Sequence, residues 1–252
     1  MSRTAKVPLP ASVTSAEFLY SGTELASMIE ARNYYRWLLG YFQPHLKGKV
    51  IEIGAGIGTF SRLILKLPEV RQLVAVEPAA NLYPLLTEQI GTDARVRTLN
   101  CYLEDMSEWG AADALLSVNV LEHVEHDEAF LDLAYRALLP GGACLLFVPA
   151  VQALYGSLDR AFEHFRRYGK RELERKLRAV GFEIDLLRYF NLPGVLAWFL
   201  AGRVLRQTSL NVRQTRYYDR WVVPWISILE RSWEPPVGQS LLAVARKPVE
   251  KR

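Results

Sequence analysis

The sequence predicts a doubly wound α/β fold, in which helices cover both faces of a parallel sheet. Short β-branched runs alternate along the chain with longer helical stretches, and the strand candidates are apolar throughout, as buried parallel strands are. The 252 residues, half of them apolar, suit one large domain or one domain with an insertion. This composition excludes a disordered chain and a disulfide-stapled mini-protein.

Seven strands, with helices between them, follow from the pattern of apolar residues. The strands are predicted at Lys49–Ile53, Gln72–Val76, Arg95–Leu99, Asp113–Val118, Ala143–Val148, Phe182–Leu187 and Ser240–Arg246. The helices are predicted at Thr59–Leu67, Asn81–Ile90, Asp127–Leu138 and Arg171–Val180. Pro140-Gly141-Gly142 and Gly181 end the last two. A further helix over Glu17–Phe42 precedes the first strand.

The connection between the sixth and seventh strands is an insertion of 52 residues, 188–239, far longer than the usual few residues. It begins with the apolar run Phe190–Gly202, which contains Trp198. Arginines follow within the insertion at 203, 206, 213, 216 and 220, together with Trp221, Trp225 and Trp233. Such a segment fits a helix in a membrane interface or the mouth for an apolar substrate. A cap packed on the sheet and a dimer contact are the alternatives.

Charge is divided unevenly along the chain. Residues 1–150 hold 12 Lys and Arg against 17 Asp and Glu, a net of −5, and residues 151–252 hold 19 against 10, a net of +9. The basic half indicates an anionic partner such as phosphate or phospholipid, or simply a solvated surface. The arginines belong to no recognisable nucleic-acid-binding module, so no specific nucleic-acid partner is predicted.

The expected location is the cytoplasm, with an anionic membrane surface as a candidate partner. The first 15 residues lack the apolar region of a secretory signal, and no segment reaches the roughly 18 apolar residues of a spanning helix. Cys101 and Cys144 lie in apolar runs, as reduced structural thiols do.

The most informative segment is the turn Gly54-Ala55-Gly56-Ile57-Gly58 between the first strand and its helix. Without Cβ atoms the backbone can approach a ligand closely, and the first amides of the helix point at that ligand. A dinucleotide fingerprint would need glycine at Thr59. Instead, Glu52 stands two residues before the first glycine, where an acid suits a cationic ammonium group rather than a pyrophosphate.

A second acid, Glu77, directly follows the second predicted strand, 19 residues after Gly58. A carboxylate at this position can accept both hydroxyls of a ribose. The glycine turn and this acid together predict a nucleoside-type pocket. The alternative is a tight turn beside a surface glutamate.

On these residues the sequence resembles the class I S-adenosylmethionine-dependent methyltransferases, of the type 11, 12 and 23 kind, over about residues 33–188 and the last strand. The glycine turn with Glu52 matches the family's first motif, and Glu77 matches its ribose-binding acid. Residues 117–124 match the motif after the fourth strand, and Pro140-Gly141-Gly142 is another family hallmark. The resemblance implies a Rossmann-like seven-stranded sheet, methyl transfer, and S-adenosylmethionine as the cofactor.

The resemblance also implies the residues that bind the cofactor. They are Tyr34, Glu52, Gly54, Ala55, Gly56, Gly58, Glu77, Pro78, Leu103, Glu104, Asn119 and Val120. Where the family commonly has Gly-Asp beside the adenine, this chain has Cys101-Tyr102, so Leu103 or Glu104 is expected to replace the usual acceptor. The implied organisation is a helical lid (1–45), a cofactor-binding core (46–187 and 240–247) and a helical insertion or cap (188–239).

Two histidines are candidate catalytic bases, because a hydroxyl acceptor must lose its proton whereas an amine need only be neutral. Both follow strands whose carboxyl ends should face the ligand. His123 follows the fourth strand, and His164 follows the fifth, with Asp159 as the residue that would orient it. The alternative is that His123 packs against the next helix and that the segment around His164 is a basic surface with Tyr168 buried.

The segment after the fifth strand also supplies the candidate acceptor-binding residues: Tyr155, Arg166, Arg167 and Tyr168. The two arginines suit a phosphate or carboxylate. Glu122-His123 and His126-Asp127 are pairs of metal-ligating type, but the sequence offers no third ligand at a distance, so no metal is predicted.

This segment resembles, more loosely, methyltransferases encoded beside glycosyltransferases, a subgroup associated with cell-envelope glycans and lipid-linked intermediates. We therefore expect methyl transfer to a hydroxyl or acid oxygen of a glycan-, phosphate- or lipid-linked small molecule. The alternatives are an N- or C-methyltransferase of a natural product, and a non-catalytic cofactor-binding scaffold on membranes. The sequence leaves the oligomeric state open.

Overall fold

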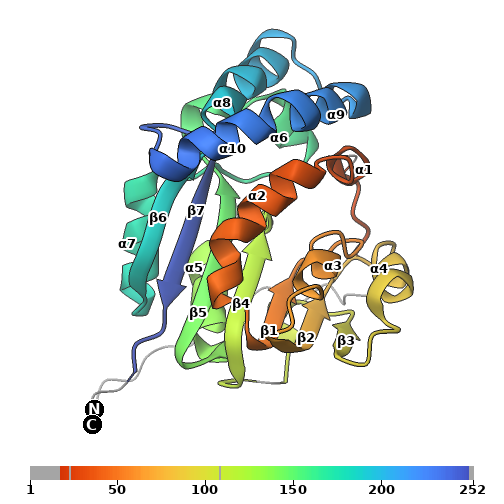
Figure 1. Cartoon of the computed structure of the whole chain (residues 1–252), viewed down its shortest axis with the longest axis vertical. Coiled ribbons are helices and arrows are strands. Elements are labelled where there is room, and N and C mark those ends of the chain that lie inside the picture. The colour runs from red at the N-terminus through yellow and green to blue at the C-terminus, as the bar shows by residue number, and fades with distance from the viewer. Residues whose placement is uncertain (1–17, 23, 108, 250–252) are drawn as a thin grey trace.

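A single seven-stranded sheet organises the chain (Figure 1). The computed structural model describes residues 18–22, 24–107 and 109–249. The strand order is β3-β2-β1-β4-β5-β7-β6, with bounds β1 (Gly48–Ile53), β2 (Val70–Val76), β3 (Val96–Leu99), β4 (Ala112–Val118), β5 (Leu138–Pro149), β6 (Glu183–Phe190) and β7 (Ser240–Arg246). The predicted seven-stranded, Rossmann-like α/β fold is confirmed.

The last strand departs from the predicted parallel sheet. Strands β1 to β5 pair in parallel, whereas β7 lies between β5 and β6 and runs antiparallel to both. The chain leaves β6 at the end of the sheet where the insertion lies, and it re-enters the sheet from that same end (Figure 1). Strand β7 must therefore run back against its neighbours.

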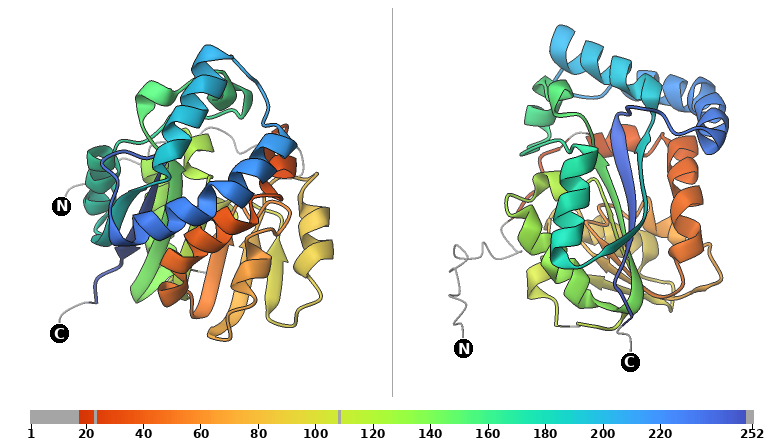
Figure 2. Two further views of the ribbon diagram at one scale, coloured as in Figure 1. Left: turned by 45° about the horizontal axis from the view of Figure 1, so that its top comes forward. Right: turned by 90° about the vertical axis from the view of Figure 1, so that its left-hand side faces the viewer.

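Helices bury a separate apolar core on each face of the sheet (Figure 2). One core contains side chains from α2 (Arg32–Phe42), α3 (Ser61–Ile64) and α4 (Tyr83–Ile90), and the other contains side chains from α5 (Asp127–Ala137) and α7 (Lys170–Val180). Successive strand residues alternate between the two cores, because side chains of a strand point to opposite faces. This burial on both faces explains why the strands are apolar throughout.

The N-terminal helix is shorter than predicted and divided in two. Over Glu17–Phe42 the structure has α1 (Glu24–Met28) and α2 (Arg32–Phe42), and Glu17 itself lies outside the described residues. The division is stabilised from a distance: the carboxylate of Asp219 accepts the backbone N–H groups of Asn33 and Tyr34 at 3.0 and 2.8 Å. These are N–H groups that a helix start leaves unsatisfied.

The helix predicted over Thr59–Leu67 is also shorter, because only Ser61–Ile64 is α-helical. Gly58, at φ +82°, and the turn residues around it extend the glycine loop into the expected first helical turn. Conversely, β5 starts at Leu138 and so takes in Pro140-Gly141-Gly142, which was expected to lie before it.

Three helices of the insertion cap the end of the sheet at which the site lies (Figures 1 and 2). They are α8 (Leu192–Phe199), continued by the π-helical turn η6 (Leu200–Val204), α9 (Val212–Trp221) and α10 (Val223–Ser232). A short helix, α6 (Ser157–Ala161), precedes α7 and packs against η6. Strand β6 continues to Phe190, three residues beyond its predicted end at Leu187. Within the described residues, no helix combines the length and the apolar character that crossing a membrane requires.

Phe190 fastens α2 to the sheet. Its side chain is fully buried, and its ring stacks on Trp37 with centroids 3.7 Å apart. Replacing a buried phenylalanine with alanine leaves a cavity as well as losing apolar burial. We expect Phe190→Ala to lower the free energy of unfolding by about 3–5 kcal/mol in denaturant titrations.

The matched control is Phe199→Ala, because Phe199 is 42% exposed. A surface substitution of this kind should change the free energy of unfolding by less than about 1 kcal/mol. Equal losses for the two variants would contradict the packing role of Phe190.

Candidate active site

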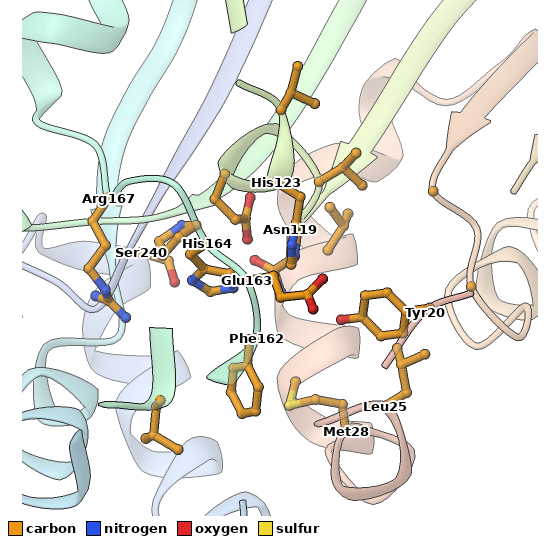
Figure 3. Close-up of a pocket in the computed structure, with 18 of the residues that line it drawn as sticks. Tyr20, Leu25, Met28, Asn119, His123, Phe162, Glu163, His164, Arg167 and Ser240 are labelled. Carbon is orange, nitrogen blue, oxygen red and sulfur yellow. The ribbon is translucent and has the colours of Figure 1, made fainter. Parts of the chain in front are cut away.

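One cavity of about 1130 Å³ lies at the carboxyl ends of the central strands. Its wall combines the N-terminal segment, the glycine loop, the loop after β4, the segment after α6 and the inner side of the insertion. Figure 3 shows side chains from several of these segments turned toward the same space. The volume exceeds the roughly 300–1,000 Å³ of a typical small-molecule pocket, so it has room for a cofactor together with an acceptor.

The glycine loop has the backbone conformation that its sequence requires. Gly54, Gly56 and Gly58 have φ values of +69°, +57° and +82°, which residues with a Cβ rarely adopt. A Cβ at Gly54 would also collide with the side chain of Val120. Gly54 and Gly56 line the cavity, whereas Ala55 and Gly58 are not part of its wall.

Glu77 ties the glycine loop to the end of β2. Its carboxylate accepts the backbone N–H of Gly56 at 2.7 Å and that of Ala79 at 2.9 Å. Burial raises the pKa of Glu77, and the two backbone hydrogen bonds oppose this shift. The side chain lines the cavity, and each oxygen keeps a lone pair for a ligand hydroxyl.

Glu52 lies behind the wall rather than in it. Its carboxylate accepts the hydroxyl hydrogen of Ser61 at 2.6 Å, and the side chain is outside the cavity lining. Burial raises the pKa of Glu52 to about 8, and the nearby Glu77 adds to this rise. In this conformation Glu52 joins the glycine loop to α3 and does not face the cavity, where the predicted ammonium group would lie.

The other residues predicted to bind the cofactor do line the cavity. They are Tyr34, Pro78, Leu103, Glu104, Asn119 and Val120. Tyr34 is a special case, because its hydroxyl hydrogen-bonds to Ser240 and Asn191 and burial raises its pKa. Its place in the wall is therefore set by tertiary contacts from two distant segments.

The candidate base His164 is held by a buried carboxylate. Its Nδ1 lies 3.1 Å from Oδ1 of Asp159. The same oxygen accepts a hydrogen bond from the Nε–H group of Arg167 at 2.7 Å. The backbone N–H of Gly156 and the indole N–H of Trp198 donate to the other oxygen of Asp159. Burial raises the pKa of Asp159, but the hydrogen bonds from His164 and Arg167 outweigh burial and lower it to about 2.

His123 and Glu122 follow β4 and face the same part of the cavity as His164. The two imidazole rings meet edge to face with centroids 4.8 Å apart (Figure 3). Burial and the neighbouring His164 lower the pKa of His123 to about 3, so the ring is neutral. Burial raises the pKa of Glu122 to about 7, close to the operating range of a general base.

Three of the four residues predicted to bind the acceptor have structural partners and lie outside the cavity lining. Tyr155 donates its hydroxyl to the backbone carbonyl of His164. Arg166 pairs with Asp127 and donates to the carbonyl of Glu125. The fully buried Tyr168 donates to Asp127 and Leu121. Arg167 alone of the four is part of the wall.

Two site features escaped the sequence reasoning. Glu122 is not among the predicted site residues, although it belongs to the matched motif over residues 117–124 and lines the cavity. Trp198 orients Asp159 and packs its ring 4.7 Å from the guanidinium carbon of Arg167. No local pattern could reveal this contact, because 39 residues separate Trp198 from Asp159.

Comparison with known proteins identifies the family. A family model described as a methyltransferase domain matches residues 31–187, more than half of the chain. The chain belongs to this family. It is an S-adenosylmethionine-dependent methyltransferase, as the sequence predicted.

The methyltransferase is also similar to individual proteins, although the sequence identities are low. A mouse protein named ubiquinone biosynthesis O-methyltransferase, mitochondrial, is 28% identical over 109 residues, which cover 41% of this chain and 28% of the mouse protein. Solved structures share the fold. One is a Thermotoga maritima methyltransferase described as a possible histamine N-methyltransferase (TM-score 0.59, 19% identity, 88% and 93% coverage of this chain and that chain). Another is Haemonchus contortus phosphoethanolamine N-methyltransferase 2 in complex with S-adenosyl-L-methionine (TM-score 0.58, 20% identity, 94% and 61% coverage of this chain and that chain).

The residues of this methyltransferase fit the cofactor. Gly56 presents a backbone without a Cβ to the cavity, and Glu77 presents a buried carboxylate beside it. These are the groups that approach and hold a nucleoside closely. Glu77 and the loop of Gly54 and Gly56 would hold the ribose end, and Leu103 and Glu104 line the same cavity.

We expect Glu77→Ala to weaken binding of S-adenosylmethionine by at least about 10-fold in calorimetric titrations, because a charged acceptor for the ligand is lost. The backbone N–H groups of Gly56 and Ala79 also lose their acceptor. The control is Glu69→Ala, an exposed glutamate in the turn before β2. An unchanged dissociation constant in a folded Glu77→Ala variant would remove Glu77 from the cofactor site.

Proposed function

We propose that this methyltransferase acts on a hydroxyl or acid oxygen of a glycan-, phosphate- or lipid-linked small molecule. One observation carries the proposal: His164, oriented by Asp159, lines the same cavity as Gly56 and Glu77. A base that is held in place by a buried carboxylate is useful to an acceptor that must lose a proton. An acceptor amine would need only to be neutral.

The chain's own residues then account for the proton. Asp159 holds the N–H of His164 at Nδ1, which leaves the lone pair of Nε2 free. The acceptor hydroxyl passes its proton to this nitrogen, and its oxygen keeps the electron pair for the new bond. When bound, S-adenosylmethionine supplies an electrophilic methyl group on a sulfonium sulfur. The apolar side chains that line the cavity exclude water from this end of the site.

The position of Arg167 supports an acceptor that carries an anionic group. Its side chain is 1% exposed and lines the cavity while it pairs with Asp159. The guanidinium also donates to the carbonyl of Ala150 at 2.6 Å, so its orientation is set before a substrate arrives. A planar guanidinium suits a phosphate or a carboxylate.

The outer side of the insertion supports a lipid-linked acceptor presented at an anionic membrane surface. Large apolar side chains are exposed on α8 to α10 and the segments between them, including Trp225 at 74%, Leu205 at 65% and Ile228 at 64% exposure. The structure describes all of residues 188–239, and the one exposed acid among them is Glu234. Six arginines of this segment are exposed: Arg203, Arg206, Arg213, Arg216, Arg220 and Arg231. Apolar and cationic side chains together favour an anionic lipid surface.

The inner side of the same insertion forms part of the cavity wall through Trp198, Gln214 and Tyr218. A membrane on the outer side would therefore lie close to the acceptor site. The name of the mouse relative, an O-methyltransferase of ubiquinone biosynthesis, supports an oxygen acceptor as well.

We expect His164→Ala to lower turnover by about 100-fold or more, as loss of a general base does. Transfer of labelled methyl from S-adenosylmethionine to a total lipid extract and to a water-soluble glycan fraction measures it. The dissociation constant for the cofactor should not change. His45→Ala is the control, because His45 lies in the turn before β1, outside the cavity wall. Full turnover in His164→Ala would leave His164 a structural role only.

We expect the wild-type protein to co-sediment with vesicles that contain phosphatidylglycerol, and salt to weaken this binding because the arginines are exposed. Replacing Trp225 and Ile228 together with serine should lower the bound fraction several-fold. Leu85→Ser is the control, since Leu85 is 46% exposed on α4, outside the insertion. An absence of vesicle binding by the wild type at low salt would contradict the membrane role.

A further inference from the structure

Glu122 is a buried carboxylate that accepts no hydrogen bond from another described residue. Its side chain is fully buried, and neither oxygen has a hydrogen-bond partner among the described residues. Buried polar atoms without a partner are rare in folded proteins, and a buried carboxylate is among the most costly. The residue lines the cavity, so a ligand that enters the cavity can reach it.

Two histidines complete a cluster around this carboxylate. One potential ligand atom of Glu122, one of His123 and one of His164 all lie within 4.8 Å of one another. The residues come from two separate segments: Glu122 and His123 from the turn η4 (Leu121–His123) after β4, and His164 from the segment after α6. The third, distant ligand that the sequence did not reveal is thus supplied by the fold.

Each histidine uses one ring nitrogen within the protein and has the other available. Asp159 accepts hydrogen bonds from Arg167 and Gly156, so the bond between Asp159 and His164 has Nδ1 of His164 as its donor. The ring of His123 donates to the backbone carbonyl of Glu163. A carboxylate or a carbonyl behind a histidine is the usual support of a metal-ligating imidazole, because it sets the tautomer and the orientation of the ring.

We propose that Glu122, His123 and His164 form a binding site for one divalent transition-metal ion, with a coordination position open to the cavity. Two imidazoles and one carboxylate suit Zn²⁺ and its neighbours in the first transition row better than Mg²⁺, which prefers oxygen ligands. Three protein ligands with an open position are typical of a catalytic rather than a structural metal site.

The charges and the spacing around the cluster are compatible with such an ion. Glu122 brings one negative charge, while the charges of Asp159 and Arg167 behind His164 offset each other. Bonds of about 2.0 Å place the ligand atoms of a tetrahedral site about 3.3 Å apart, so the cluster must contract from its present spacing. The Glu122 carboxylate can move to do so, because no hydrogen bond holds it.

The catalytic consequence rests on the proposed function. An acceptor hydroxyl that occupies the open position loses its proton to water at a lower pH, because the ion stabilises the oxyanion. In the metal-loaded enzyme, His164 then acts as a ligand rather than as the base. Metal binding itself requires no acceptor and no cofactor, and it is therefore tested separately.

The test uses the full chain without an affinity tag, stripped with a chelator and titrated calorimetrically with Zn²⁺. We expect one ion per chain and, with Co²⁺ in place of Zn²⁺, the visible absorption bands of a low-coordinate Co²⁺ site. Glu122→Gln, His123→Ala and His164→Ala should each weaken binding at least about 10-fold, since each removes a ligand. His45→Ala and His126→Ala control for the other histidines of the chain and should bind as the wild type does.

Glu122→Gln keeps the volume of the side chain, and unchanged binding of S-adenosylmethionine verifies that each variant is folded. The proposal is overturned if the wild type binds neither ion at concentrations up to about 1 mM, or if all three ligand variants bind as tightly as the wild type. Methyl transfer that persists in the stripped protein without metal binding would leave the proposed function standing and remove only the metal. Metal binding without methyl transfer to any oxygen acceptor would leave the metal site standing and contradict the proposed function.

Discussion

The carboxylate of Asp159 is the interaction on which the acceptor end of the site depends. It accepts hydrogen bonds from His164, Arg167, Gly156 and Trp198, and its side chain is fully buried. Through these contacts one charge orients the candidate base, compensates Arg167 and joins helix α8 of the insertion to α6. Its low pKa follows from those donors, because burial alone would raise it.

The site is otherwise distinguished by three buried glutamates that are satisfied to different degrees. Glu52 and Glu77 accept hydrogen bonds from Ser61 and from the glycine loop, and they stabilise the shape of the cofactor end. Glu122 has no such donor at the acceptor end. A protein keeps a buried carboxylate without a hydrogen-bond donor at a cost, and this cost supports the metal ion that we propose as its ligand.

The insertion joins two properties that the sequence left as alternatives. Its inner side packs as a cap, with Asp219 holding the start of α2 and Trp198 holding Asp159. Its outer side exposes tryptophan, leucine and arginine side chains. A cap over the sheet and a surface suited to lipid are therefore compatible descriptions of one segment, because a helix presents different faces to the core and to its surroundings.

By itself the sequence determined the class of fold, the order of the strands along the chain and the backbone conformation of the glycine loop. Continuous apolar strands indicate burial on both faces of the sheet, and the glycines at 54, 56 and 58 indicate a backbone conformation that other residues avoid. Both features can be predicted because each depends on a short stretch of sequence. Only the tertiary structure decided the direction of β7, the division of the N-terminal helix, the structural roles of Tyr155, Arg166 and Tyr168, and the meeting of Glu122 with His123 and His164. Each of these features depends on contacts between segments distant in the chain, such as Asp219 with Tyr34. A local pattern of residues cannot predict such contacts.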